Sequence, residues 1–318
     1  MASATTSVAA DLSTLSGRDF LSSADASAGQ TAALLELAGQ LKSGDRRIDL
    51  GNRVLGLIFT KASTRTRVSF QVAMARLGGQ TVDLNPQVTQ LGRGEPLEDT
   101  ARVLSRFCDV LAVRTFAQQE LADYAYWATI PVINALTDLE HPCQALADFL
   151  TMREAFGDLR GQTLTYVGDG NNVAHSLMLC GALLGVNVRI GCPEGFEPLP
   201  GVLEQARSLA VGGAQITVTS DPAEAARGAQ ALYTDVWASM GQEQEQAERE
   251  RAFQGFCLNE ELLAEADSRA IVLHCLPAHR GEEISAGVME GPASRIFDQA
   301  ENRLHAQQAL LAALLGGL

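Results

Sequence analysis

The stretch VLGLIFTKASTRTRVSFQVAMARL, residues 54–77, contains the pattern that decides the fold. Val54–Phe59 is an unbroken apolar run, which is typical of a buried strand, and Thr64–Leu77 has the mixed periodicity of an amphipathic helix. Ser63 lies between them and belongs to the residue types that cap helix N-termini. A strand that leads directly into a helix is the building unit of parallel sheets with helical crossovers.

The same rhythm continues along the rest of the chain. Further helices are predicted over Leu97–Phe107 and Gln144–Phe156. Apolar runs of strand length occur at Val54–Phe59, Thr81–Leu84, Val110–Val113, Val132–Asn134, Thr163–Val167, Val186–Ile190, Ile216–Thr219, Ala231–Thr234 and Ile271–Leu273. This alternation of strands and helices predicts an α/β fold.

These strands could form one large sheet, but a division into two domains fits the chain better. The helix that covers Pro142–Phe156 ends in GDLRG at residues 157–161, which indicates a boundary, and 318 residues suit two domains. We expect domains over residues 1–150 and 151–299, each a parallel sheet flanked by helices. The periodicity of Glu301–Leu315 predicts a C-terminal helix, within residues 300–318, that returns to the first domain.

Composition limits the classes of partner. The net charge of −14 argues against a nucleic-acid or membrane partner, because both call for a basic face. Six cysteines without a CxxC pair favour free thiols in a reducing compartment, and therefore the cytoplasm. Residues 1–12 contain no basic residue, so we expect a frayed tail there and not a targeting peptide. No run approaches the ~20 apolar residues of a membrane span.

Arginines become informative only where they cluster. Two of the 24 basic residues are lysines, which leaves 22 arginines, whose planar side chains suit phosphate and carboxylate. A cluster follows the first strand, where Ser63 and the free N–H groups of the helix start precede Arg65 and Arg67. The alternative is a capped helix with exposed arginines. Arg114 follows another strand and would reach the same sheet edge, so a phosphate site is favoured.

A second polar group opens the helix at Pro142. His141 could be a capping or packing residue, but a His N–H can also polarise a carbonyl oxygen, and the Gln144 amide can bind an adjacent NH₂ group. The Walker A loop of nucleotide hydrolases is absent from the sequence, which disfavours that class.

Polar residues also follow strands of the second domain. The GDGNN turn at residues 168–172 lacks the third glycine of a dinucleotide fingerprint, and its Asn172 could bind a carboxylate at a helix start. Asp235 could cap a helix or pair with an amine. Cys275 could be an inert buried thiol or could orient an amine proton. His274, Cys275 and His279 lack the spacing of a full metal ligand set, so no metal is expected. Residues 242–251 (QEQEQAERER) are interpreted as a solvated segment.

Taken in order, these segments resemble the aspartate/ornithine carbamoyltransferase family over nearly the whole chain. The STRTR and HPCQ segments, at residues 63–67 and 141–144, are similar to motifs shared across carbamoyltransferases. The DVWASMG and HCLP segments, at residues 235–241 and 274–277, are similar to those of the ornithine branch. The resemblance implies a site in a cleft between two α/β domains, and a homotrimer or a multiple of trimers.

The resemblance also implies the roles of individual residues. Carbamoyl phosphate would be bound by Ser63, Thr64, Arg65, Thr66, Arg114, His141, Gln144, Cys275, Leu276 and Arg303, with Gln90 reaching a neighbouring subunit's site. Ornithine would be bound by Asn172, Asp235, Ser239 and Met240. The catalytic groups would be Cys275, Asp235, Arg114 and His141.

The expected reaction is transfer of the carbamoyl group from carbamoyl phosphate to the δ-amine of L-ornithine, which gives L-citrulline and phosphate. It needs no cofactor and no covalent enzyme intermediate. The alternatives are a carbamoyltransferase for another amine (acetylornithine, putrescine or aspartate) and a catalytically silent ligand-binding homologue. A nicotinamide-dependent dehydrogenase is disfavoured by the missing third glycine.

Overall fold

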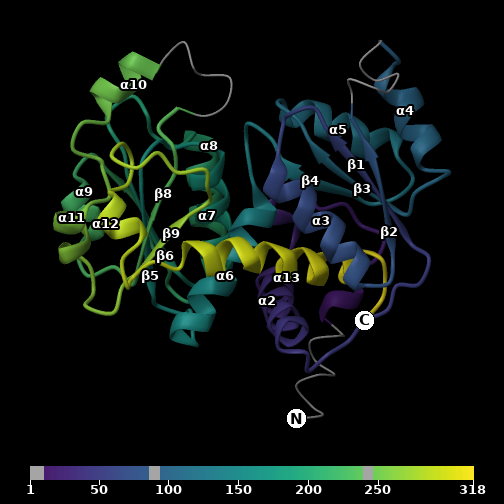
Figure 1. Ribbon diagram of the computed structural model, residues 1–318, viewed down its shortest axis with the longest axis horizontal. Helices are drawn as coiled ribbons and strands as arrows, with labels where there is room; N and C mark the ends of the chain where they lie inside the picture. Colours follow the sequence, from purple (N-terminus) through teal and green to yellow (C-terminus); the bar gives the residue numbers. More distant parts are fainter. Residues whose placement is uncertain (1–10, 86–93, 239–245) are drawn as a thin grey trace. The chain divides into compact units, whose positions relative to one another are not determined.

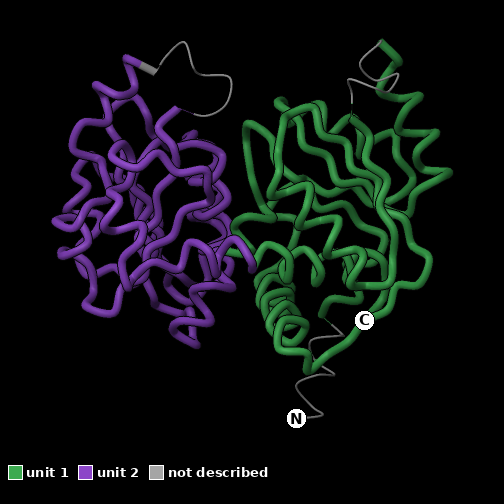
Figure 2. The backbone as a smooth tube through the Cα atoms, viewed as in Figure 1, with its two compact units in different colours: residues 1–147, 302–318 green, residues 148–301 purple. Residues whose placement is uncertain are grey.

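The chain forms two compact units, which the computed structural model describes over residues 11–85, 94–238 and 246–318. Unit 1 comprises residues 1–147 and 302–318, and unit 2 comprises residues 148–301 (Figure 2). Two helices run across the division in the sequence: α6 (Pro142–Phe156) and α13 (Ile296–Leu314).

Unit 1 is built on a four-stranded parallel sheet in the order β2-β1-β3-β4 (Figure 1). Its strands are β1 (Val54–Phe59), β2 (Gln80–Leu84), β3 (Val110–Arg114) and β4 (Val132–Leu136). Its helical elements are η1 (Ser23–Asp25), α2 (Ala28–Ser43), α3 (Thr64–Arg76), α4 (Leu97–Leu104), α5 (Gln118–Trp127), the start of α6 and most of α13. The continuous apolar runs of β1, β3 and β4 are almost wholly buried, as expected for strands covered on both faces.

Unit 2 is built on a five-stranded parallel sheet in the order β7-β6-β5-β8-β9. Its strands are β5 (Thr163–Val167), β6 (Asn187–Gly191), β7 (Ile216–Thr219), β8 (Ala231–Thr234) and β9 (Ile271–His274). Its complete helices are α7 (Asn172–Leu184), α8 (Pro200–Leu209), α9 (Pro222–Ala226), α10 (Gln246–Ala252), α11 (Glu260–Glu265) and α12 (Ala286–Met289). Every residue of α7 from Val173 to Leu184 is buried, so this helix is a central packing element of unit 2.

The structure confirms the predicted α/β class and all nine predicted strands, with ends that differ by at most two residues. The C-terminal helix begins at Ile296, earlier than the predicted Glu301, and its portion from Asn302 onward belongs to unit 1. The helix predicted over Leu97–Phe107 ends at Leu104. In the part of the chain that the structure describes, no helix combines the length and the apolar character needed to cross a bilayer.

Candidate functional site

The start of α3 is a capped helix N-terminus with a buried hydroxyl behind it. Ser63 is the N-cap, and its side chain accepts a hydrogen bond from the Thr66 backbone N–H at 3.2 Å. Thr66 is completely buried, whereas Thr64 and Arg65 are exposed at the positive end of the helix dipole. Arg67 has a different role, because its guanidinium pairs with Asp83. The predicted phosphate segment therefore offers N–H groups and one exposed guanidinium to an anion.

Two buried arginines converge on the Thr66 hydroxyl. Arg303 Nη2 donates to Thr66 Oγ1 at 2.5 Å, and Arg114 Nη1 makes a longer contact of 3.4 Å with the same oxygen. Arg303 also donates through Nη1 to Gln144 Oε1 at 2.8 Å. Arg114 is only 7% exposed, and Arg303 is only 3% exposed. Two guanidinium groups that meet at one hydroxyl present planar donors of the kind that suits phosphate and carboxylate.

His141 lies directly before α6 and is buried in the same unit. Burial lowers its pKa well below the usual value for histidine, and the charges of Arg303 and Arg114 lower it further. The imidazole is therefore neutral at physiological pH, so it carries one N–H that can be donated to a polarised carbonyl oxygen. Unit 1 brings together Thr66, Arg114, His141, Gln144 and Arg303, all of which the sequence analysis had named.

The second polar group belongs to unit 2 and follows β8 and β9. The Cys275 thiol donates to Asp235 Oδ1 at 3.0 Å, and Asp235 is 6% exposed. Burial raises the pKa of Cys275 well above its usual value, and the negative charge of Asp235 raises it further. Cys275 is therefore a neutral thiol at physiological pH, and it orients the carboxylate instead of acting as a thiolate.

The chain after Cys275 has a constrained backbone. Leu276 has a φ of +59°, and the Leu276–Pro277 peptide bond is cis. The Leu276 N–H donates to His274 Nδ1 at 2.8 Å, and His274 Nε2 lies 3.0 Å from Glu283 Oε1. Both ring nitrogens of His274 thus have protein partners. Asp235, His274 and Cys275 are close enough to share a metal ion. In this structure, however, both ring nitrogens of His274 are engaged with Leu276 and Glu283.

Two unit 2 residues emerge that the sequence analysis had missed. Asn171 caps α7 by accepting from Val173 N and Ala174 N at 2.9 and 3.3 Å, and its amide donates to Asp235 Oδ2 at 3.3 Å. Asn172, which had been named, is the first helical residue. The preference of asparagine for the N-cap position was the signal that could have found Asn171.

Arg249 is the other missed residue. It is 7% exposed, and its Nη1 donates to Asp169 Oδ2 at 2.7 Å and to the Trp237 carbonyl at 2.9 Å. The interpretation of residues 242–251 as solvated is therefore wrong for this residue. Its charge pairs with a carboxylate next to β5, and no local pattern indicates that distant partner. Gln90, Ser239 and Met240 lie outside the described residues.

The fold and the two groups define a class of protein: a two-unit α/β chain with a buried arginine cluster in one unit and a carboxylate–thiol pair in the other. Two domain descriptions of one family match the sequence. Residues 18–154 match the carbamoyl-P binding domain of aspartate/ornithine carbamoyltransferase, and residues 160–314 match its Asp/Orn binding domain. The chain belongs to the aspartate/ornithine carbamoyltransferase family.

Individual relatives cover nearly the whole chain. An ornithine carbamoyltransferase from Parasynechococcus marenigrum is 85% identical over 318 residues, which is 100% of both chains. The crystal structure of ornithine carbamoyltransferase from Gloeobacter violaceus has 57% identity and a TM-score of 0.86, and the match covers 94% of this chain and 98% of that one. The ornithine carbamoyltransferase from Pyrococcus furiosus has 48% identity and a TM-score of 0.91 over 96% and 99% of the two chains.

Proposed function

We propose that this chain transfers the carbamoyl group of carbamoyl phosphate to the δ-amine of L-ornithine, which yields L-citrulline and phosphate. The observation that carries the proposal is the cluster of Thr66, Arg114, His141, Gln144 and Arg303, which combines buried positive charge with a neutral imidazole. Three ornithine carbamoyltransferases that share 48–85% identity with this chain support the choice of acceptor.

Unit 1 supplies the groups for the phosphorylated substrate. The α3 N-terminus, with Ser63, Thr64 and Arg65, would bind the phosphate, and Gln144 would accept from the carbamoyl NH₂ group. Thr66, Arg114 and His141 would stabilise the negative charge that develops on the carbonyl oxygen. We assign residues 1–150 and 300–318 to carbamoyl phosphate binding and residues 151–299 to ornithine binding.

Unit 2 supplies the groups for the amine. Asp235 would attract the cationic amine group, and the Cys275 thiol would hold the carboxylate in place, while Asn172, Ser239 and Met240 would bind the rest of ornithine. The backbone of Cys275 and Leu276 would contact the carbamoyl NH₂. Asp235, oriented by Cys275, would accept one proton from the cationic δ-amine, and the neutral amine would then attack the carbamoyl carbon. The bond from that carbon to the phosphate oxygen would break, and the departing phosphate would accept the second amine proton.

The proposed environment and assembly follow from the same assignment. We propose a cytoplasmic enzyme, since all six cysteines are free. We also propose a homotrimer in which Gln90 reaches a neighbouring site. Sedimentation equilibrium tests the assembly, because a trimer has three times the 33.8 kDa mass of the chain. A monomer at micromolar concentration would contradict this part of the proposal.

The decisive test is citrulline formation by an Arg114→Ala variant. Loss of a donor to the developing oxyanion lowers kcat by roughly 10²–10³. Arg106→Ala removes an exposed arginine of the same unit and is the matched control, with unchanged turnover. Near-normal turnover of Arg114→Ala with saturating carbamoyl phosphate would contradict the assigned role.

A panel of amines tests the identity of the acceptor. A preference for putrescine, acetylornithine or aspartate would overturn the assignment of ornithine as the acceptor.

A further inference from the structure

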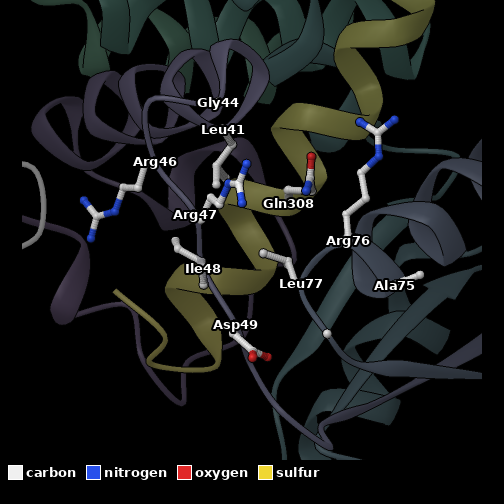
Figure 3. A pocket seen from close by; sticks show the side chains of 11 residues that line it. Leu41, Gly44, Arg46, Arg47, Ile48, Asp49, Ala75, Arg76, Leu77 and Gln308 are labelled. Atoms are coloured by element: carbon white, nitrogen blue, oxygen red, sulfur yellow. The ribbon is translucent and has the colours of Figure 1, made fainter.

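Unit 1 contains a pocket of about 590 Å³ whose lining shares no residue with the site described above. It is formed by the C-terminal ends of α2 and α3, by the segment that follows α2, and by one residue of α13 (Figure 3). The lining residues that carry polar side chains are Arg46, Arg47, Asp49, Arg76 and Gln308.

Positive charge dominates this pocket, although the chain as a whole carries a net charge of −14. In the described part of the chain, the structure shows no hydrogen bond or ion pair for the guanidinium groups of Arg46, Arg47 and Arg76. Nη1 of Arg46 is also buried from solvent. Asp49, the single acidic lining residue, accepts from the Gly51 N–H through Oδ1. Unneutralised arginines gathered around one hollow favour a ligand of opposite charge.

Helix capping accounts for only part of this charge. Basic residues in a last helical turn are favoured by the helix dipole, and Lys42 of α2 and Arg76 of α3 occupy such positions. Arg46 and Arg47 lie beyond Gly44, the left-handed C-cap that ends α2, so the dipole gives no reason for two further cations there.

Gln308 supplies an independent observation. It is 5% exposed, it lines the pocket, and its Oε1 is buried without a hydrogen-bond partner among the described residues. Figure 3 shows its amide between the side chains of Arg47 and Arg76, while Arg46 extends to one side. A buried acceptor without a partner costs free energy, which a ligand that donates a hydrogen bond would recover.

We propose that this pocket is a second anion site, which binds a small oxyanion that also carries an N–H or O–H donor. Arg47 and Arg76 bind the phosphate or carboxylate group, and Gln308 accepts from the donor. Arg46 adds positive charge at the side of the pocket. Such a ligand satisfies the charge and the buried acceptor together.

The test is calorimetric titration with inorganic phosphate and, separately, with citrate. An Arg65→Gln background weakens anion binding at the α3 N-terminus, and the difference between the double variant and its control isolates the contribution of the pocket. Arg47→Gln combined with Arg76→Gln should weaken binding about tenfold or more, because two charge-assisted contacts are lost. Both side chains belong to exposed residues, so the fold is retained. Arg106→Gln removes an exposed charge elsewhere in unit 1 and should leave the affinity unchanged.

The two probes separate the sources of the anion. Binding of phosphate alone identifies a phosphate ligand, binding of citrate alone identifies a carboxylate ligand, and both results support the site. Gln308→Leu should weaken the binding of both probes, because citrate has a hydroxyl donor and protonated phosphate has an O–H donor. Equal affinity in the double variant and the Arg106 control, or no binding of either probe, overturns the proposal. Citrulline formation is also measured for the Arg47→Gln, Arg76→Gln variant with Arg65 intact. This assay tests the proposed reaction, whereas the titrations test the pocket, so the failure of one can be told from the failure of the other.

Discussion

The surroundings of the Cys275 thiol set its protonation state. Its burial and the adjacent Asp235 carboxylate both disfavour the thiolate. Cysteine reactivity depends on the thiolate, so Cys275 is a poor nucleophile here and a good hydrogen-bond donor. A residue that could have been assigned as a nucleophile is thus better assigned as an orienting group.

Alkylation of Cys275 tests this assignment. Iodoacetamide at pH 8 should modify Cys275 slowly in the wild type. Asp235→Asn removes the negative charge, so the pKa should fall and the rate should rise, roughly tenfold for each unit of pKa. Mass spectrometry of the Cys275 peptide gives the rate. Cys257, which is partly exposed, is the internal control with an unchanged rate. Fast labelling of Cys275 in the wild type would contradict a protonated thiol.

His141 makes stability depend on pH. Its pKa is lowered on folding, so the unfolded state binds more protons below the usual histidine pKa of about 6.5. The stabilisation is fully present above that pH and is lost as the pH falls below it. The urea midpoint of the wild type should therefore decrease from pH 7.5 to pH 5.5, with the pH values chosen to span about 6.5.

His141→Gln should make this decrease smaller, since a glutamine cannot be protonated in that range. Arg106→Gln is the control, because it replaces an exposed side chain of the same unit by the same residue type, and the pH dependence should stay that of the wild type. Identical pH profiles for the wild type and His141→Gln would show that His141 is not buried in a neutral form.

At the scale of elements, the α7 N-terminus connects a helix cap to Asp235, the residue that we propose for ornithine binding. Asn171 satisfies two backbone N–H groups of α7 and also contacts Asp235. Asn171→Ala should destabilise unit 2 by about 1 kcal/mol through loss of the cap. It should also raise the KM for ornithine while the KM for carbamoyl phosphate stays unchanged.

Asn171→Ser separates these two effects. Serine caps helices about as well as asparagine, but it has no amide to donate to Asp235. Thermal denaturation should show stability close to that of the wild type, while the KM for ornithine stays raised. Recovery of both quantities would mean that Asn171 acts through the cap alone.

Elements were easier to predict from the sequence than the contacts between them. Inner strands such as β1 and β5 are almost wholly buried, so their apolar runs were visible directly, and Ser63 was recognisable as a cap. Asn171 and Arg249 were missed because their partners, Asp235 and Asp169, are far away in the sequence. Arg303 was named only through the family resemblance, since its contact with Thr66 spans 237 residues.

At the scale of the whole molecule, unit 1 is made from two separated stretches of chain. The C-terminal stretch contributes buried residues of α13 to unit 1, including Leu310, Leu311 and Leu314. Burial of each such side chain stabilises a fold by about 1.5–3 kcal/mol, while a domain has a net stability of only about 5–15 kcal/mol. The C-terminal stretch is therefore essential to unit 1.

Truncation tests this dependence. Removal of residues 302–318 should leave unit 1 unfolded, so that limited proteolysis degrades residues before Ala147 much faster than in the full chain. Removal of residues 316–318 is the control and should have little effect, because these residues lie beyond α13 and are not buried. A truncated chain with a protease-resistant unit 1 would contradict the prediction.

The division of unit 1 between both ends of the chain also governs the order of events during synthesis. A ribosome makes residues 1–147 before unit 2, yet the α13 segment that completes their core is made after unit 2. Unit 2 is continuous and can fold while translation proceeds. Unit 1 is thus started before unit 2 but finished after it, and its nascent apolar surfaces need protection until residues 302–318 have been made.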